Sequence, residues 1–215
     1  MERIRTLVSA GSLVASPLLL LTYWLTYPAY GEFGGDAIIR EVDQAPVMTA
    51  VSDVFIVLGA ILAVPMSLSL MQVLQGAASR TALLGGALSV VGWIAVTALV
   101  MVDGVAIEIA NQGPTDELVG MFEDLLTSPL VIALNVVASL HLIGGVLLGI
   151  ALIRSRIIPT WLAIGATLAV PVHLASNLAD QLWLDSITWV VVAAAYALVI
   201  PSLFTHDADT RVGAL

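Results

Sequence analysis

From Ser128 to Gln181 the chain reads SPLVIALNVVASLHLIGGVLLGIALIRSRIIPTWLAIGATLAVPVHLASNLADQ, two long apolar runs joined by a turn that carries Arg154 and Arg156. Each run exceeds about 18 residues and is nearly free of charge, which is the length that a helix needs to cross a bilayer core of about 30 Å. Pro159 follows the two arginines and suits the first turn of the second helix. The stretch therefore predicts a transmembrane hairpin.

The rest of the chain shares this apolar character. Hydrophobic residues make up 60% of the 215 residues and charged residues 11%, and the mean hydropathy is +1.04. Soluble domains are roughly half apolar and a quarter charged, so the composition predicts an integral membrane protein whose partner is the lipid bilayer. The net charge is -9 and no basic stripe is present, which argues against a nucleic-acid partner. Neither Cys nor Lys occurs, which excludes cysteine nucleophiles, cysteine metal sites and lysine Schiff bases.

The apolar runs recur and predict an all-α fold, a bundle of six transmembrane helices that forms a single domain over residues 1–215. Placing the amino terminus in the cytoplasm puts six of the seven arginines inside and only Arg40 outside, as the positive-inside rule requires. We therefore expect a multi-pass protein of the plasma membrane with both termini in the cytoplasm. The predicted spans are 6–27, 48–74, 82–110, 129–153, 159–181 and 187–204.

Two connecting features are also informative. Between the third and fourth spans, Leu118, Phe122 and Leu125 recur at helical spacing among acidic residues, which predicts a short helix lying on the membrane surface. At the far end of the first span, four aromatic residues predict a belt at the membrane interface. These four are Tyr23, Trp24, Tyr27 and Tyr30.

Several motifs together carry a resemblance to a known family. In the second half they are Leu140-His141, Gly145, Gly149, Arg154-Ser155-Arg156-Ile157-Ile158-Pro159, Trp161 and Gly165, and in the first half Ser52-Asp53-Val54-Phe55 and Arg80. This pattern resembles a bacterial and archaeal family of small six-helix integral membrane proteins, the domain of unknown function numbered four-three-eight-six. Isoleucines replace the aromatic residues usual in the family's turn, and Arg156 stands where glycine is usual. The resemblance implies a prokaryotic membrane protein and brings no activity with it.

Six polar side chains fall inside the predicted spans, in the outer half or near the middle of the bilayer. They are Asp53, Asp103, Asn135, His141, His173 and Asn177. An ionisable group at a helix centre costs at least about 2.5 kcal/mol and usually marks a pathway or a pair. We therefore expect an outward-facing polar cluster in which Asp103 and His173, at similar depth, form a pair. The alternative is purely structural, with the pair and the asparagines only holding helices together.

Two functional hypotheses follow from this cluster. The first is a non-enzymatic bundle that transports or senses a small solute or protons, without a cofactor. The second is a redox enzyme that holds haem b between His141 and His173, or a metal at His173, Asn177 and Asp103. The predicted depths of the two histidines differ by about 8 Å, which disfavours haem. The hydrolase motifs Gly-x-Ser-x-Gly and His-Glu-x-x-His are absent.

Small residues and prolines inside the spans affect how the helices pack and bend. Gly145 and Gly149 have the spacing that lets helices approach closely, either within the bundle or between two copies in a homo-oligomer. Pro65 and Pro171 lie inside the second and fifth spans, where proline removes a backbone hydrogen bond and predicts a kink.

Overall fold

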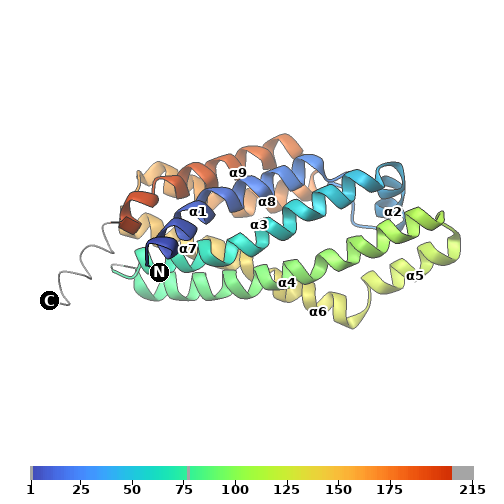
Figure 1. Ribbon diagram of the computed structural model, residues 1–215, viewed down its shortest axis with the longest axis horizontal. Coiled ribbons are helices and arrows are strands. Elements are labelled where there is room, and N and C mark those ends of the chain that lie inside the picture. The colour runs from blue at the N-terminus through green and yellow to red at the C-terminus, as the bar shows by residue number, and fades with distance from the viewer. Residues whose placement is uncertain (1, 77, 205–215) are drawn as a thin grey trace.

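The computed structural model describes residues 2–76 and 78–204, and this part of the chain is built of α-helices that run along one long axis (Figure 1). The predicted all-α class is confirmed. The tail from residue 205, which includes Arg211, lies outside the described residues. The helices are α1 (Glu2–Thr26), α2 (Gly35–Gln44), α3 (Pro46–Val73), α4 (Ser79–Gln112), α5 (Asp116–Leu126), α6 (Pro129–Ala138), α7 (Leu140–Ser155), α8 (Thr160–Leu178) and α9 (Leu182–Ala197).

Six stretches of the described chain are long and apolar enough to cross a membrane, in agreement with the six predicted spans. The last of them begins at Leu182 and not at Ile187, so that Asp185 belongs to the span and not to the link before it. The stretches are Thr6–Thr26, Pro46–Val73, Ser79–Gln112, Pro129–Ser155, Thr160–Leu178 and Leu182–Phe204.

The spans pack as a ring in which each contacts the next along the chain. α1 packs on α3, α3 on α4, α4 on α7, α7 on α8 and α8 on α9, and the ring closes where α9 packs on α1. The core between them is lined by small residues and leucines, among them Ala60, Ala163 and Leu70, each wholly buried. Small side chains let helices approach closely, so van der Waals contact can hold the ring together where lipid removes the hydrophobic driving force.

The closest of these contacts is a glycine seam between α4 and α7. A Cβ added to Gly92 would lie 2.2 Å from the backbone nitrogen of His141, and one added to Gly144 would lie 2.5 Å from the backbone nitrogen of Ser89. Only glycine fits at these positions unless the two backbones separate. Gly145 and Gly149 pack on the other side of α7, against Val170 and Thr167 of α8. They bring helices together inside the bundle, and association between two copies stays a prediction.

The fourth span is broken into α6 and α7 at Ser139, although it contains no proline there. Nearby side chains form hydrogen bonds with backbone carbonyl oxygens at this point. The Ser139 hydroxyl donates to the carbonyl oxygen of Asn135 at 2.8 Å, and Nδ1 of His141 lies 2.5 Å from the carbonyl oxygen of Ala138. Such bonds compete with regular helix bonds. α3 and α8, by contrast, continue as helices through Pro65 and Pro171.

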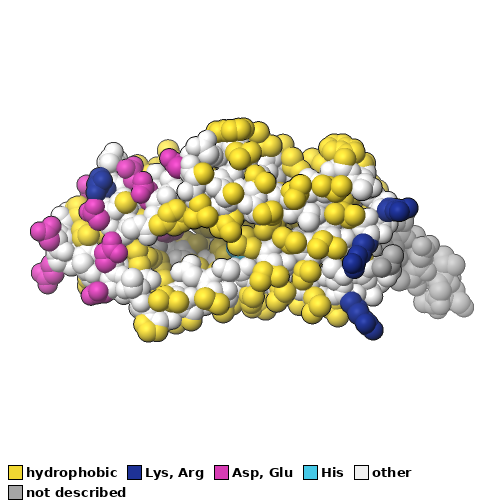
Figure 2. Space-filling model, turned by 180° about the vertical axis from the view of Figure 1, so that it is seen from behind, with side chains coloured by type: hydrophobic (Ala, Val, Ile, Leu, Met, Phe, Trp, Pro, Cys, Tyr) yellow, Lys and Arg dark blue, Asp and Glu magenta, His cyan; other side chains and the backbone are white. Residues whose placement is uncertain are grey.

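The two ends of the bundle carry opposite charge (Figure 2). Acidic side chains gather at the end formed by α2 and α5, together with Arg40, which pairs with Asp36. This is the acid-rich end. The arginine-rich end is formed by the start of α4 and the end of α7, where the Arg154 guanidinium donates to Thr81 at 3.0 Å. An apolar band separates the two ends, as expected of a surface that faces lipid.

A second, smaller core lies at the acid-rich end. Phe122 of α5 is only 1% exposed and packs with Ile39 and Val42 of α2 against the last turns of α4. The helix predicted between the third and fourth spans is thus present. Its central aromatic residue packs on protein, however, where we expected its apolar face to lie on the membrane surface. The connection between the first two predicted spans contains α2, a helix that was not predicted.

Candidate functional site

A cavity of about 360 Å³ lies in the half of the bundle nearer the acid-rich end. Figure 2 shows a hollow in the apolar band with a histidine side chain visible inside it. The cavity wall includes four of the six predicted site residues, Asp103, Asn135, His141 and His173. It also includes aromatic side chains that were not predicted to belong to a site: Tyr23, Trp24, Tyr27, Trp93 and Trp189.

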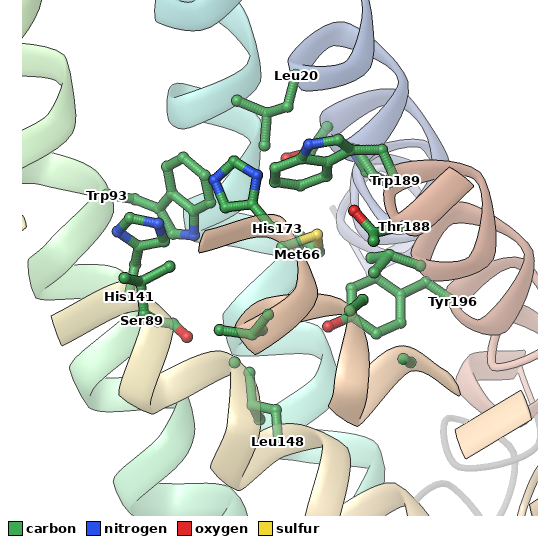
Figure 3. A pocket seen from close by; sticks show the side chains of 18 residues that line it. Leu20, Met66, Ser89, Trp93, His141, Leu148, His173, Thr188, Trp189 and Tyr196 are labelled. Carbon is green, nitrogen blue, oxygen red and sulfur yellow. The ribbon is translucent and has the colours of Figure 1, made fainter. Parts of the chain in front are cut away.

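A narrower chamber of about 60 Å³ continues from this cavity toward the arginine-rich end. The two share His141, Trp93, His173 and Trp189, which Figure 3 shows in a row across the pocket. A water molecule needs roughly 10–15 Å³ of such space, so the chamber has room for a few waters at most. Buried Leu148 of α7 lies at its far side. The space inside the bundle is therefore wide in the half nearer the acid-rich end and narrows toward the arginine-rich end, where Leu148 lies.

His141 is fixed by the helix break described above. A carbonyl oxygen can only accept, so Nδ1 carries the proton that it shares with Ala138, and the neutral ring then has its acceptor lone pair on Nε2. The imidazole packs on the indole of Trp93, with ring centroids 4.4 Å apart. Trp93 is itself 7% exposed. The break thus presents one hydrogen-bond acceptor at the boundary between cavity and chamber.

His173 of α8 pairs with a buried carboxylate. Its Nδ1 lies 2.6 Å from Oδ1 of Asp185 on α9, and this aspartate is wholly buried while the histidine side chain is 15% exposed. The Thr188 hydroxyl lies 3.3 Å from the same carboxylate oxygen. The ring of His173 packs between Trp24 and Trp189, at centroid distances of 5.4 and 5.3 Å. Asp185 therefore orients the imidazole, as a carboxylate does for histidines whose second nitrogen acts on a ligand.

Tyr30, in the link after α1, extends this arrangement. Its hydroxyl lies beside Asp185. Burial, followed by the nearby carboxyl groups of Asp185 and Asp180, raises the pKa of Tyr30 well above its ordinary value. The phenol consequently keeps its proton, and a donor faces the buried carboxylate.

Asp103 has a different partner from the one predicted. The Tyr27 hydroxyl donates to Oδ1 of Asp103 at 3.1 Å, while the Nδ1 of His173 is bound to Asp185. The expected Asp103–His173 pair is therefore wrong as a direct bond. Both residues nevertheless line the same cavity, because α4 and α8 are the two neighbours of α7 in the ring and both contribute to the cavity wall.

The remaining predicted residues differ in their position. Asn135 lines the cavity from α6 and donates to the carbonyl oxygen of Val131 at 3.1 Å. Asp53 lies near Asp103, and its buried Oδ1 has no hydrogen-bond partner among the described residues, but it is not part of the cavity wall. Asn177 also lies outside the wall, so the structure does not assemble it with Asp103 into one ligand set.

The two cofactor hypotheses, a metal ion and haem b, require side chains that are free to act as ligands. Within residues 2–76 and 78–204, no group of three or more His, Asp or Glu side chains is placed to hold a metal ion. His141 and His173 line one cavity, but each has its Nδ1 bound to a protein oxygen. Haem b held between the two Nε2 atoms stays a prediction.

The cavity thus combines three indoles, two oriented imidazoles and a tyrosine-bound carboxylate. Comparison with family models, with curated proteins and with solved structures finds no match to this chain.

Proposed function

We propose that the protein binds a small solute in the larger cavity and transports or senses it across the membrane, with protonation of the His173–Asp185 pair linked to binding. The observation that carries this proposal is that four of the six polar residues singled out within the predicted spans meet in one cavity. A volume of about 360 Å³ lies within the range of small-molecule sites, roughly 300–1,000 Å³. A mostly apolar wall with a few convergent polar groups is the usual composition of such sites.

The direction of access follows from the proposed topology. With arginines on the cytoplasmic side, the arginine-rich end faces the cytoplasm and the acid-rich end faces outward. The larger cavity then lies in the outer half of the bundle, and the narrow chamber and Leu148 lie between it and the cytoplasmic end. In this orientation both termini are cytoplasmic and the protein resides in the plasma membrane.

A labelling experiment tests both the cavity and the topology, because the chain lacks cysteine and each introduced thiol is unique. In intact cells a charged, membrane-impermeant thiosulfonate should modify the Asn135→Cys variant, whose side chain lines the cavity, and the Leu142→Cys variant more slowly, since Leu142 lies deeper. The reaction needs a thiolate in water, so Val136→Cys, next along α6 and outside the cavity wall, should stay unmodified.

Two further variants serve as orientation controls. Glu117→Cys on α5 should react in intact cells, and Arg80→Cys at the start of α4 should react only after permeabilisation. The reverse pattern would overturn the topology. Equal rates for Asn135→Cys and Val136→Cys would show that water does not enter the cavity, and the proposed function would fail.

Proton linkage has a separate measurement. Liposomes containing the purified protein and a trapped pH-sensitive dye are given an inside-negative potassium diffusion potential, and we expect the interior to acidify faster than in empty liposomes. His173→Gln should reduce this rate to that of empty liposomes, because glutamine cannot take up a proton. Asn177→Ala, one turn along α8 and outside the cavity wall, should keep the original rate. Acidification that is unchanged in His173→Gln would remove the pair from the proposal.

A further inference from the structure

The break at Ser139 divides the fourth span into two parts that contact different neighbouring helices. On the arginine-rich side of the break, α7 packs on α8 and the ring is closed. On the other side, α6 packs on α4 and has no substantial contact with α8 among the described residues. Figure 1 shows α6 departing from the bundle beside α5. The wall between the fourth and fifth spans is thus complete in one half of the bundle and open in the other.

This gap lies at the level of the larger cavity. Asn135 and Ser139 both line the cavity and are both exposed on the surface of the protein. Both belong to the stretch Pro129–Ser155 that crosses the membrane. The neighbouring exposed side chains of α6 are apolar, with Ile132 52% and Val136 64% exposed. The cavity therefore has a side opening that faces hydrocarbon and whose edge carries an amide and a hydroxyl.

The larger cavity offers two imidazole acceptors beside the N–H donors of its three indoles. The proton on Nδ1 of His141 is directed at Ala138, and that on Nδ1 of His173 at Asp185. The Tyr27 hydroxyl is already directed at Asp103. Neither Nε2 atom has a hydrogen-bond partner in the described part of the chain. A ligand hydroxyl suits both kinds of group, because it can donate to an imidazole Nε2 and accept from an indole N–H.

The indoles add a shape requirement. Trp24, Trp93 and Trp189 all line the larger cavity, and indole faces favour flat or ring-shaped partners. The volume of about 360 Å³ accommodates a ring with a few substituents but not an additional long chain. A chain attached to that ring would have to leave through the opening between α6 and α8, where it would meet lipid.

From these features we propose that the ligand of the cavity is a membrane-dissolved amphiphile, with a hydroxylated ring as its headgroup and a hydrocarbon chain, which enters sideways between α6 and α8. This inference rests on the proposed binding function and specifies its substrate class. The ring hydroxyl donates to Nε2 of His173 or His141, and the chain remains in the outer leaflet.

The test uses the tryptophans as reporters. Trp161 and Trp183 are exposed and lie outside the cavity wall, so both are replaced by Phe to leave Trp24, Trp93 and Trp189. The protein is placed in phosphatidylcholine vesicles and titrated with a ring-brominated phenol that carries a dodecyl chain, because bromine quenches indole fluorescence on contact. We expect saturable quenching, and about tenfold weaker binding in His173→Gln, a loss of about 1.4 kcal/mol.

Three comparisons decide the route. The same bromophenol without a chain should quench only at far higher concentration, and a brominated alkane without the ring should show no saturation. Asn135→Phe, which places a bulky ring at the opening, should slow the onset of quenching about tenfold, whereas Val136→Phe, beside it on the lipid-facing side, should leave it unchanged. Ser139→Phe provides a second obstruction should Asn135→Phe fail to fold.

The outcomes separate this inference from the proposed function. Equal quenching by the short and long phenols, with no effect of Asn135→Phe, would mean entry from water and would overturn the sideways route. Absence of saturable quenching, with Asn135→Cys still labelled from outside, would overturn the ligand class and leave a water-filled site. If the labelling also fails, both proposals fall together.

Discussion

The His173→Ala variant is expected to lose about 3 to 5 kcal/mol of its free energy of unfolding, measured by sodium dodecyl sulfate titration of the purified protein in mixed micelles. Asp185 is wholly buried, and Nδ1 of His173 is its closest partner, at 2.6 Å. Removal of the imidazole leaves a carboxylate in low-dielectric surroundings with only hydroxyl groups nearby, and that penalty exceeds the loss of the bond itself.

Matched variants distinguish the interaction energy of the His173–Asp185 pair from other effects of the substitutions. Asp185→Ala should cost less than His173→Ala, because a neutral imidazole can still meet water in the cavity, and the double variant should cost clearly less than the sum of the two. Asn177→Ala, one turn along α8, should change the unfolding free energy by less than about 1 kcal/mol. Strictly additive losses would show that the two side chains do not stabilise each other.

The second large effect is expected at the glycine seam. Gly92→Ala should lower the free energy of unfolding by about 3 kcal/mol in the same titration, because the new Cβ would lie 2.2 Å from the backbone nitrogen of His141 and 2.8 Å from the carbonyl oxygen of Ala138. Neither contact is the movable end of a side chain, so α4 and α7 have to separate. The shift should also displace His141 and alter the fluorescence of Trp93, which packs on it.

Gly104 on the same helix supplies the control. No atom lies within 4 Å of a Cβ built there, so Gly104→Ala should be neutral or stabilise the protein by up to about 1 kcal/mol through helix propensity. If Gly92→Ala behaved like Gly104→Ala, the close approach of α4 and α7 would not exist in the membrane.

The spans were predictable because hydrocarbon imposes length and polarity on every crossing segment, independently of its neighbours. A helix has to satisfy all its backbone groups internally and remain apolar for about 20 residues, and both properties are local in sequence. The same locality explains the correct prediction of α5 from the spacing of Leu118, Phe122 and Leu125. The smaller core at the acid-rich end was missed, because α2 is short and its link is mostly polar.

The polar pairing was not predictable from depth. Asp103 and His173 have similar predicted depths, but α4 and α8 are not adjacent in the ring, whereas α8 and α9 pack directly on each other. The available signal was the spacing of His173 and Asp185, which places them at matching levels on the two arms of one hairpin. The predicted spans end at 181 and begin again at 187, so they leave Asp185 in the link, because hydropathy places a carboxylate outside an apolar run.

The aromatic side chains illustrate a related ambiguity. Tyr23 and Tyr27 were interpreted as an interfacial belt, yet Tyr23 is 5% exposed and Tyr27 donates to Asp103 within the cavity wall. Aromatic residues near the end of a span suit both lipid headgroups and a binding site, and hydropathy does not distinguish them. The side of the helix that faces the ring interior depends on neighbours that the pattern of one span does not contain.

The order of the ring has a consequence for biogenesis. Each span packs on the one inserted just before it, so during synthesis a new helix finds its partner already in the membrane. In the described part of the chain, the substantial contact between spans that are not consecutive is that of α9 with α1. His173 and Asp185 both belong to the last hairpin, 12 residues apart. The carboxylate can therefore enter the bilayer with its imidazole alongside, and the costliest group of the protein need not spend time unpaired in lipid. A chain that stalls before α9 would lack the buried aspartate, and its ring of helices would remain open. Such an incomplete ring would be a substrate for a quality-control protease.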